Sequence, residues 1–133
     1  MSIDLKAVKF KNQYNKMSYN SQMLLNKLIV ECDKKLLTHT STDTPDYRIF
    51  IEHAGKNSKL NYCLIKLKTR EDLIKIHLRT DGYKILQNDK LRVNRLDRHN
   101  YNGKEWCEVT LKSEKDIELA VDYIMQVYRN IMI

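Results

Sequence analysis

The stretch Leu73-Ile74-Lys75-Ile76-His77-Leu78-Arg79 decides the fold, because apolar and polar side chains alternate from Ile74 to Arg79. Alternation with a period of two is typical of a β-strand that buries one face and leaves the other in water. The preceding residues 60–68 also have the composition of a strand. The short polar link at residues 69–72 therefore predicts an antiparallel hairpin between these two strands.

One further strand is predicted on each side of this hairpin. Residues 47–53 are rich in aromatic and β-branched side chains and end at the turn Gly55-Lys56-Asn57-Ser58. Residues 106–112 follow a turn at residues 101–103.

Helices are predicted before and after this run of strands. From Ser18 or Ser21, either of which can cap a first turn, apolar side chains recur at helical spacing as far as Leu37. A second helix starts at Ser113, with Asp116 at the capping-box position, and continues with an apolar stripe. Residues 1–17 are either an N-terminal arm or a short helix.

Strands clustered between helices predict an α+β fold: an antiparallel sheet of about four strands packed against an N-terminal and a C-terminal helix on one face. Residues 18–133 then form a single domain, which suits a chain of 133 residues. Residues 38–46 are predicted to be a loop. In the connector at residues 80–100, residues 90–93 are either a short strand or one helical turn.

Bulk composition narrows the class of protein. The chain is 42% hydrophobic and 31% charged, unlike a disordered or a membrane-embedded chain. No apolar run approaches the roughly 18 residues of a membrane span, and the N-terminus lacks the apolar stretch of a signal peptide. The three widely spaced cysteines, Cys32, Cys63 and Cys107, indicate buried free thiols in a reducing compartment. A cytoplasmic protein without membrane contact is expected.

Specific catalytic and cofactor motifs are missing from the sequence, so we predict no catalytic residue, no cofactor and no metal. Three glycines cannot build a phosphate-binding loop, the cysteines lack C-x-x-C spacing, and the four histidines show no ligand pattern. His99 is either a general base in a pocket with Trp106 or, as we favour, a residue that hydrogen-bonds its own loop.

Basic residues gather in the connector and on the strand before it. The formal net charge of +7 favours an anionic partner. The residues predicted to bind nucleic acid are Lys75, His77, Arg79, Lys84, Lys90, Arg92, Arg95 and Arg98, with Tyr83 and Tyr101 to stack on bases. The alternative is a solvated charged loop, and the functional interpretation requires these side chains to converge on one exposed face.

Residues 20–130 resemble a small domain family of unknown function. The resemblance lies in residues 73–79, in the basic connector with His99 and Gly103, and in the run Glu108-Val109-Thr110-Leu111-Lys112-Ser113-Glu114-Lys115-Asp116-Ile117 that leads to Tyr128. Members are often called "predicted transport protein", are found at the C-terminus of restriction-like and defence-associated proteins, and are distantly similar to the MmcQ/YjbR-type fold. The resemblance implies a module that accompanies nucleic-acid-processing enzymes.

Two functions are therefore expected first. One is a non-catalytic nucleic-acid-binding accessory module in a bacterial or phage defence or counter-defence setting. The other is a protein-interaction module or small inhibitor that places its basic face on an acidic or nucleic-acid-processing protein. An enzyme or small-ligand binder that uses His99 and Trp106 ranks third. The sequence does not predict the oligomeric state.

Overall fold

The alternating strand lies in the middle of the sheet in a computed structural model of the chain, which describes residues 8–35, 39–41, 46–52, 59–96 and 105–131. This strand, β4 (Leu73–Arg79), has the bounds that the alternation predicts. It pairs antiparallel with β3 (Lys59–Lys68) on one side and with β6 (Trp106–Leu111) on the other. The predicted hairpin between β3 and β4 is confirmed.

Within the described residues the sheet has six antiparallel strands in the order β1-β2-β3-β4-β6-β5, more than the four predicted. β2 (Tyr47–Glu52) matches a predicted strand. The two additional strands lie at the edges. β1 (His39–Ser41) falls in the predicted loop, and β5 (Asn94–Arg95) follows residues 90–93, which form neither a strand nor a helical turn. Strands this short show no sequence periodicity of their own. β1 depends on pairing with β2, and β5 depends on pairing with β6.

The first two helices are joined by a capped turn. α1 (Val8–Lys16) shows that part of the N-terminal segment is helical, and α2 (Tyr19–Lys35) follows it. The hydroxyl of Ser18 accepts the N–H of Ser21 at 3.1 Å, so Ser18 is the N-cap of α2. The Ser18 N–H in turn donates to Asp72 Oδ1 at 2.9 Å, which fastens the start of α2 to the hairpin turn.

The last helix starts through a short 3-10 turn. η2 (Glu114–Asp116) leads into α3 (Ile117–Ile131). The Asp116 carboxylate accepts the N–H of Ser113 at 3.2 Å, as the capping-box position predicts. The apolar stripe of α3 then packs on the sheet from its first turn onward.

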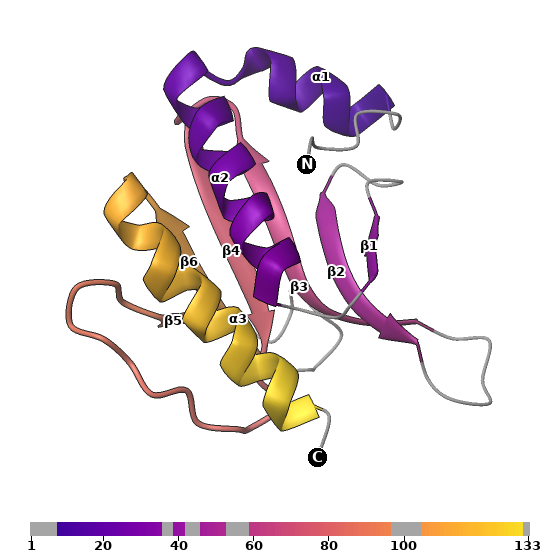
Figure 1. Cartoon of the computed structure of the whole chain (residues 1–133), viewed down its shortest axis with the longest axis vertical. Coiled ribbons are helices and arrows are strands. Elements are labelled where there is room, and N and C mark those ends of the chain that lie inside the picture. Colours follow the sequence, from indigo (N-terminus) through magenta and orange to yellow (C-terminus); the bar gives the residue numbers. More distant parts are fainter. Residues whose placement is uncertain (1–7, 36–38, 42–45, 53–58, 97–104, 132–133) are drawn as a thin grey trace.

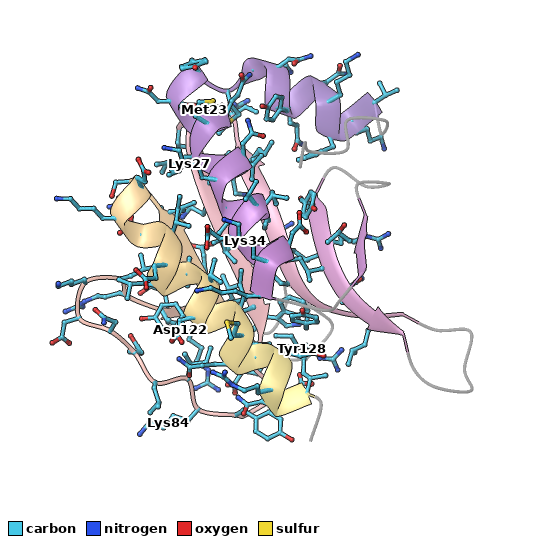
Figure 2. All side chains as sticks on the ribbon, viewed as in Figure 1. Met23, Lys27, Lys34, Lys84, Asp122 and Tyr128 are labelled. Carbon is cyan, nitrogen blue, oxygen red and sulfur yellow. The ribbon has the colours of Figure 1, made fainter. Side chains whose placement is uncertain are left out.

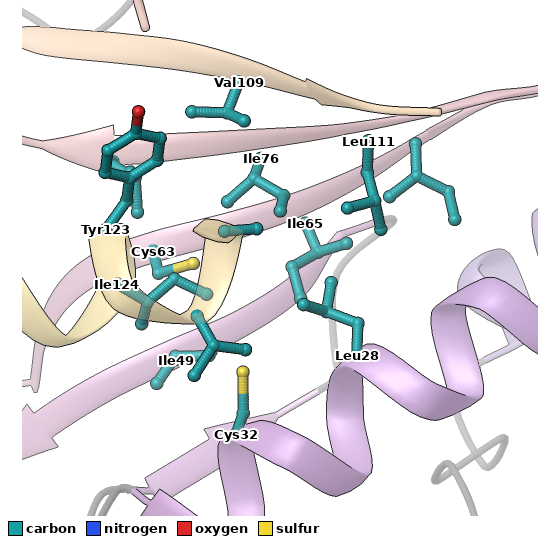
Figure 3. Packing of buried hydrophobic residues seen from close by; sticks show 14 of the residues in the cluster. Leu28, Cys32, Ile49, Cys63, Ile65, Ile76, Val109, Leu111, Tyr123 and Ile124 are labelled. Atoms are coloured by element: carbon teal, nitrogen blue, oxygen red, sulfur yellow. The ribbon is translucent and has the colours of Figure 1, made fainter. Parts of the chain in front are cut away.

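Both α2 and α3 cover the same face of the sheet, which confirms the predicted α+β arrangement (Figure 1). Ile65, Ile76 and Val109 stand opposite one another on β3, β4 and β6 and are fully buried beneath the helices (Figure 3). Removing such side chains from water is the main driving force for this packing.

All three cysteines are free and buried, as predicted. Burial raises the pKa of the Cys32 and Cys107 thiols to about 12. Both side chains therefore stay protonated at neutral pH and act as small apolar residues of the core.

A β-bulge at Tyr62 shapes the sheet beneath the end of α3. Ile49 pairs with Cys63 and Phe50 with Asn61, so the β2–β3 register skips Tyr62. A bulge of this kind re-aims the side chain of the additional residue. The Tyr62 ring packs against the ring of Tyr128 on α3, with the ring centroids 5.9 Å apart (Figure 2).

Candidate functional site

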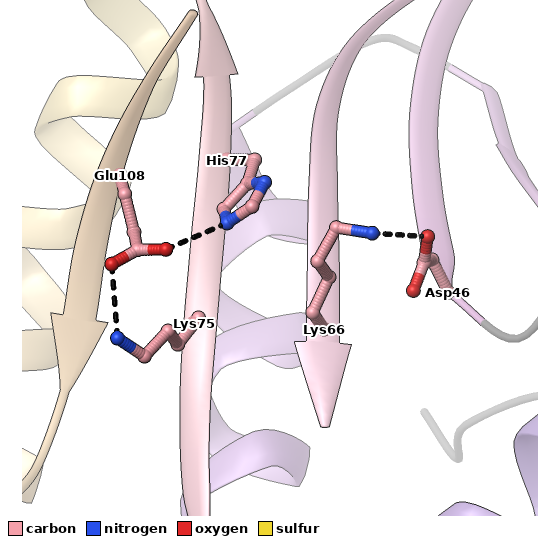
Figure 4. Close-up of polar contacts among 5 residues, drawn as sticks. All are labelled: Asp46, Lys66, Lys75, His77 and Glu108. Carbon is pink, nitrogen blue, oxygen red and sulfur yellow. Dashed lines mark hydrogen bonds and ion pairs between the residues drawn. The ribbon is translucent and has the colours of Figure 1, made fainter. Parts of the chain in front are cut away.

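The face of the sheet opposite α2 and α3 carries a network of ion pairs (Figure 4). Glu108 on β6 accepts from two residues of β4: Lys75 Nζ lies 2.9 Å from Glu108 Oε1, and His77 Nε2 lies 2.9 Å from Glu108 Oε2. On β3, Lys66 pairs with Asp46 at 2.8 Å. The charges of Lys66 and Lys75 on this face are therefore balanced by Asp46 and Glu108.

The His77–Glu108 contact is largely shielded from water. His77 is only 6% exposed, and desolvation lowers the pKa of its ring although Glu108 acts in the opposite direction. Burial also acts to raise the pKa of Glu108, but the hydrogen bonds from Lys75 and His77 outweigh it, so this pKa is lowered. At neutral pH the carboxylate is ionised and the imidazole is neutral. The charge of Glu108 is then balanced by Lys75.

Two more of the predicted cations also have carboxylate partners. Arg79 Nε lies 2.7 Å from Oδ2 of Asp81, and the Arg95 guanidinium lies 3.0 Å from Oε2 of Glu105. A cation already paired with a carboxylate has less to gain from a phosphate than a free one. Lys75, Arg79 and Arg95 are thus weaker candidates for phosphate contacts than the sequence indicates.

Three of the predicted site residues, Arg98, His99 and Tyr101, lie outside the described residues. Trp106, the other member of the predicted pocket, is 5% exposed and stands opposite Arg79 in the β4–β6 ladder. Its side chain is therefore buried at the start of β6.

The described part of the connector, residues 80–96, leaves the sheet through a tight turn. Asp81 and Gly82 have φ values of 48° and 87°, and the Tyr83 N–H donates to the Thr80 carbonyl at 2.8 Å. Positive φ at both central residues is the pattern of a type I′ turn, for which Asp-Gly is a preferred sequence. The chain reverses here and runs along the outer flank of α3 (Figure 1).

Two side chains of α3 fasten the connector to the helix. The Tyr123 hydroxyl accepts the N–H of Asn88 at 2.7 Å and donates to the carbonyl of Leu91 at 2.5 Å. The Gln126 amide accepts the N–H of Leu86 at 2.9 Å and donates to the carbonyl of the same residue at 3.2 Å. These bonds satisfy backbone groups that have no strand partner here. The backbone of the connector is therefore held in one conformation, which defines where its side chains lie.

The fastened connector turns its basic side chains outward. Ile85 and Leu91 are buried in the core, whereas Lys84, Lys90 and Arg92 are exposed. Tyr83 is 49% exposed. In the described part of the chain, none of these three cations forms an ion pair with a carboxylate.

The sheet separates the two groups of predicted cations. Lys75 and His77 point away from the helices, whereas the connector that carries Lys84 and Lys90 packs against α3. The continuous basic patch that the functional interpretation required is not formed by β4 and the connector together. Of the predicted cations that the structure describes, Lys84, Lys90 and Arg92 are the ones that have no carboxylate partner among the described residues.

A hollow of about 440 Å³ lies between the connector and α3. Its polar lining comes from Lys84, Gln87 and Asn88 of the connector and from Asp122, Gln126, Arg129 and Asn130 of α3. Figure 2 labels Lys84 on the connector and Asp122 on α3. None of the α3 residues in this lining is among the predicted site residues. A signal was present, because Asp122, Gln126 and Arg129 are spaced by four and three residues and share one face of the helix.

A second, larger depression of about 610 Å³ lies between α2 and α3. Met23, Val30 and Ile117 give it apolar walls, and an ion pair of 2.9 Å between Lys27 and Glu114 lies at its rim. We call it the interhelical groove.

Comparison with protein-family models, with curated proteins and with solved structures finds no match to this chain. Among the described residues, no three His, Cys, Asp or Glu side chains gather in a way that could hold a metal ion. In the same part of the chain, none of the helices has the length and apolar character needed to cross a membrane.

Proposed function

We propose that the chain is a non-catalytic nucleic-acid-binding module that grips the phosphate backbone with the connector and the adjoining end of α3. The side chains assigned to phosphate contacts are Lys84, Lys90, Arg92 and Arg129. Tyr83 is assigned to stacking on a base, because half of its surface is exposed beside these cations.

The observation that carries this proposal is the pairing state of the connector cations. Among the predicted cations that the structure describes, Lys75, Arg79 and Arg95 pair with carboxylates, whereas Lys84, Lys90 and Arg92 have no carboxylate partner among the described residues. A phosphate that approaches the connector therefore displaces water and counterions and breaks no internal ion pair. The hydrogen bonds from Tyr123 and Gln126 hold the connector in place before a ligand arrives, which lowers the entropic cost of binding.

The setting of this activity is proposed from other features. The three free, buried thiols suit the reducing cytoplasm. The resemblance to domains of defence-associated proteins points to a bacterial or phage defence or counter-defence system, in which the module accompanies a nucleic-acid-processing enzyme.

Fluorescence anisotropy with a labelled single-stranded oligonucleotide at low salt tests the proposal. The variant Lys84→Gln/Lys90→Gln/Arg92→Gln is expected to bind about 10- to 100-fold more weakly than the unmodified chain, because three phosphate contacts are lost. The variant Lys9→Gln/Lys11→Gln/Lys16→Gln removes the same charge from exposed positions of α1 and serves as the control. If both variants weaken binding equally, the loss of affinity comes from the change in net charge alone, and a role for the connector is refuted.

The interhelical groove favours a second candidate function, a protein-interaction module or small inhibitor of a nucleic-acid-processing enzyme. Its apolar walls and the 38% exposed Met23 are features that a partner helix could cover. This function would be selected over the first by a defined partner that forms a stoichiometric complex with the unmodified chain. The complex should be lost with Met23→Lys and should still form with the connector variant.

A further inference from the structure

We infer that the hollow between the connector and α3 is a subsite for one nucleotide of a single strand. The inference rests on the proposed function and names the form of nucleic acid that it takes. The volume of about 440 Å³ falls in the range of small-ligand sites, about 300–1,000 Å³. A mononucleotide combines an anionic group with a planar, polar ring, and the hollow offers a complement for each.

The two amide side chains of the connector are fixed as hydrogen-bond donors. Gln87 Oε1 accepts the N–H of Val93 at 3.2 Å, and Asn88 Oδ1 accepts the N–H of Lys90 at 2.9 Å. Because each carbonyl oxygen is taken by the backbone, the orientation of each amide is defined by the chain itself. Among the described residues neither NH₂ group has an acceptor, so both are available as donors at the hollow.

The hollow contains both cations and a carboxylate, and each suits a different part of a nucleotide. Lys84 and Arg129 have no ion-pair partner among the described residues and suit a phosphate. Asp122 accepts one hydrogen bond, from Gln126 Nε2 at 3.0 Å, and keeps further acceptor capacity. A carboxylate opposes a simple anion but accepts from the exocyclic or ring N–H of a base.

An apolar surface for the face of the base lies at the same place. Leu86 is 76% exposed although it is a large apolar side chain, and Leu119 lines the hollow from the helix. The Gln126 amide bonds to both the backbone N–H and the backbone carbonyl of Leu86. These two bonds fix the backbone at this exposed residue.

A base can enter the hollow and present its Watson–Crick edge to these groups only when it is unpaired. In a duplex the Watson–Crick edges are occupied and the bases are stacked inside the helix. The hollow therefore favours single-stranded DNA or RNA over a duplex of the same sequence.

The test uses substitutions that keep the backbone contacts and invert the donors. In Gln87→Glu/Asn88→Asp each side chain retains an oxygen for the N–H of Val93 or Lys90, but the NH₂ donor becomes a carboxylate oxygen. Asn12→Asp/Asn15→Asp adds the same charge at exposed positions of α1 and is the matched control. Affinity is measured for a single strand and for its duplex, and mononucleotides and inorganic phosphate are titrated into ¹⁵N-labelled protein.

Three results support the inference. The single strand binds more tightly than the duplex, mononucleotides shift the amide signals of Gln87 and Asn88 more than phosphate does, and the donor inversion weakens single-strand binding about tenfold beyond the control. If the donor inversion equals the control while the connector-cation variant still loses affinity, the subsite is refuted and the proposed function stands. If no oligonucleotide binds at low salt, both are refuted. If an acidic peptide shifts these signals and nucleotides do not, the hollow serves a protein partner and the inference is also refuted.

Discussion

At the scale of single residues, Glu108 decides what the open face of the sheet can do. One carboxylate takes both Lys75 and His77, which lie 33 and 31 residues earlier in the chain. The alternation of residues 73–79 predicts correctly that both side chains lie on one face. The pairing could not be predicted, because it depends on which strand becomes the neighbour of β4 and in which register.

The lowered pKa of His77 gives the stability of the protein a defined pH dependence. The folded state holds the imidazole neutral, so the stabilisation is complete above the ordinary histidine pKa of 6.5 and is lost as the pH falls through the lowered folded pKa. Glu108 and Asp72 also have lowered pKa values, but their contributions are lost only at more acidic pH, below the ordinary values of 4.5 and 3.8. Unfolding in urea as a function of pH measures the effect.

The variant His77→Gln is expected to flatten this dependence below pH 6.5. Glutamine can still donate to Glu108, but it does not titrate. An unchanged slope of stability against pH in this variant would contradict the assignment to His77.

At the scale of elements, the sequence predicts what is local and misses what depends on pairing. β4, the hairpin and α3 appear at the predicted places because their apolar periodicity lies within one segment. β1 and β5 have three and two residues, and each exists only as an addition to a longer neighbour. The connector has no periodicity, and it is held by two polar side chains of α3 and by the burial of Ile85 and Leu91.

Removing the hydrogen bonds of one of these two side chains, Tyr123 or Gln126, is expected to destabilise the connector locally and to leave the fold intact. Tyr123→Phe leaves the N–H of Asn88 and the carbonyl of Leu91 without the tyrosine hydroxyl. Loss of such a bond costs about 1–3 kcal/mol locally, so hydrogen exchange at Asn88 should accelerate by about tenfold or more.

Tyr128→Phe is the control for this experiment, because Tyr128 contributes its ring to the contact with Tyr62. Exchange at Asn88 should stay unchanged in the control. Equal exchange in both variants would show that the hydroxyl of Tyr123 does not fasten the connector.

At the scale of the whole molecule, the distribution of charge matters more than its sum. The sequence gives a net charge of +7 and a cluster of basic residues. The Asp81-Gly82 pair suits a turn, but the sequence does not indicate that the connector then runs along the side of α3, away from Lys75 and His77. The candidate site is consequently smaller than predicted, and it includes Arg129, which the sequence analysis did not select.

The dependence of single-strand affinity on salt tests the central claim most directly. For four phosphate contacts, the logarithm of the association constant should fall with the logarithm of salt concentration with a slope of about −3. Lys84→Gln/Lys90→Gln/Arg92→Gln should make this slope less steep by about two, since each contact contributes about 0.7. Lys9→Gln/Lys11→Gln/Lys16→Gln should leave it unchanged. A slope that is the same in the unmodified chain and in the connector variant would contradict the claim that these cations hold the phosphates.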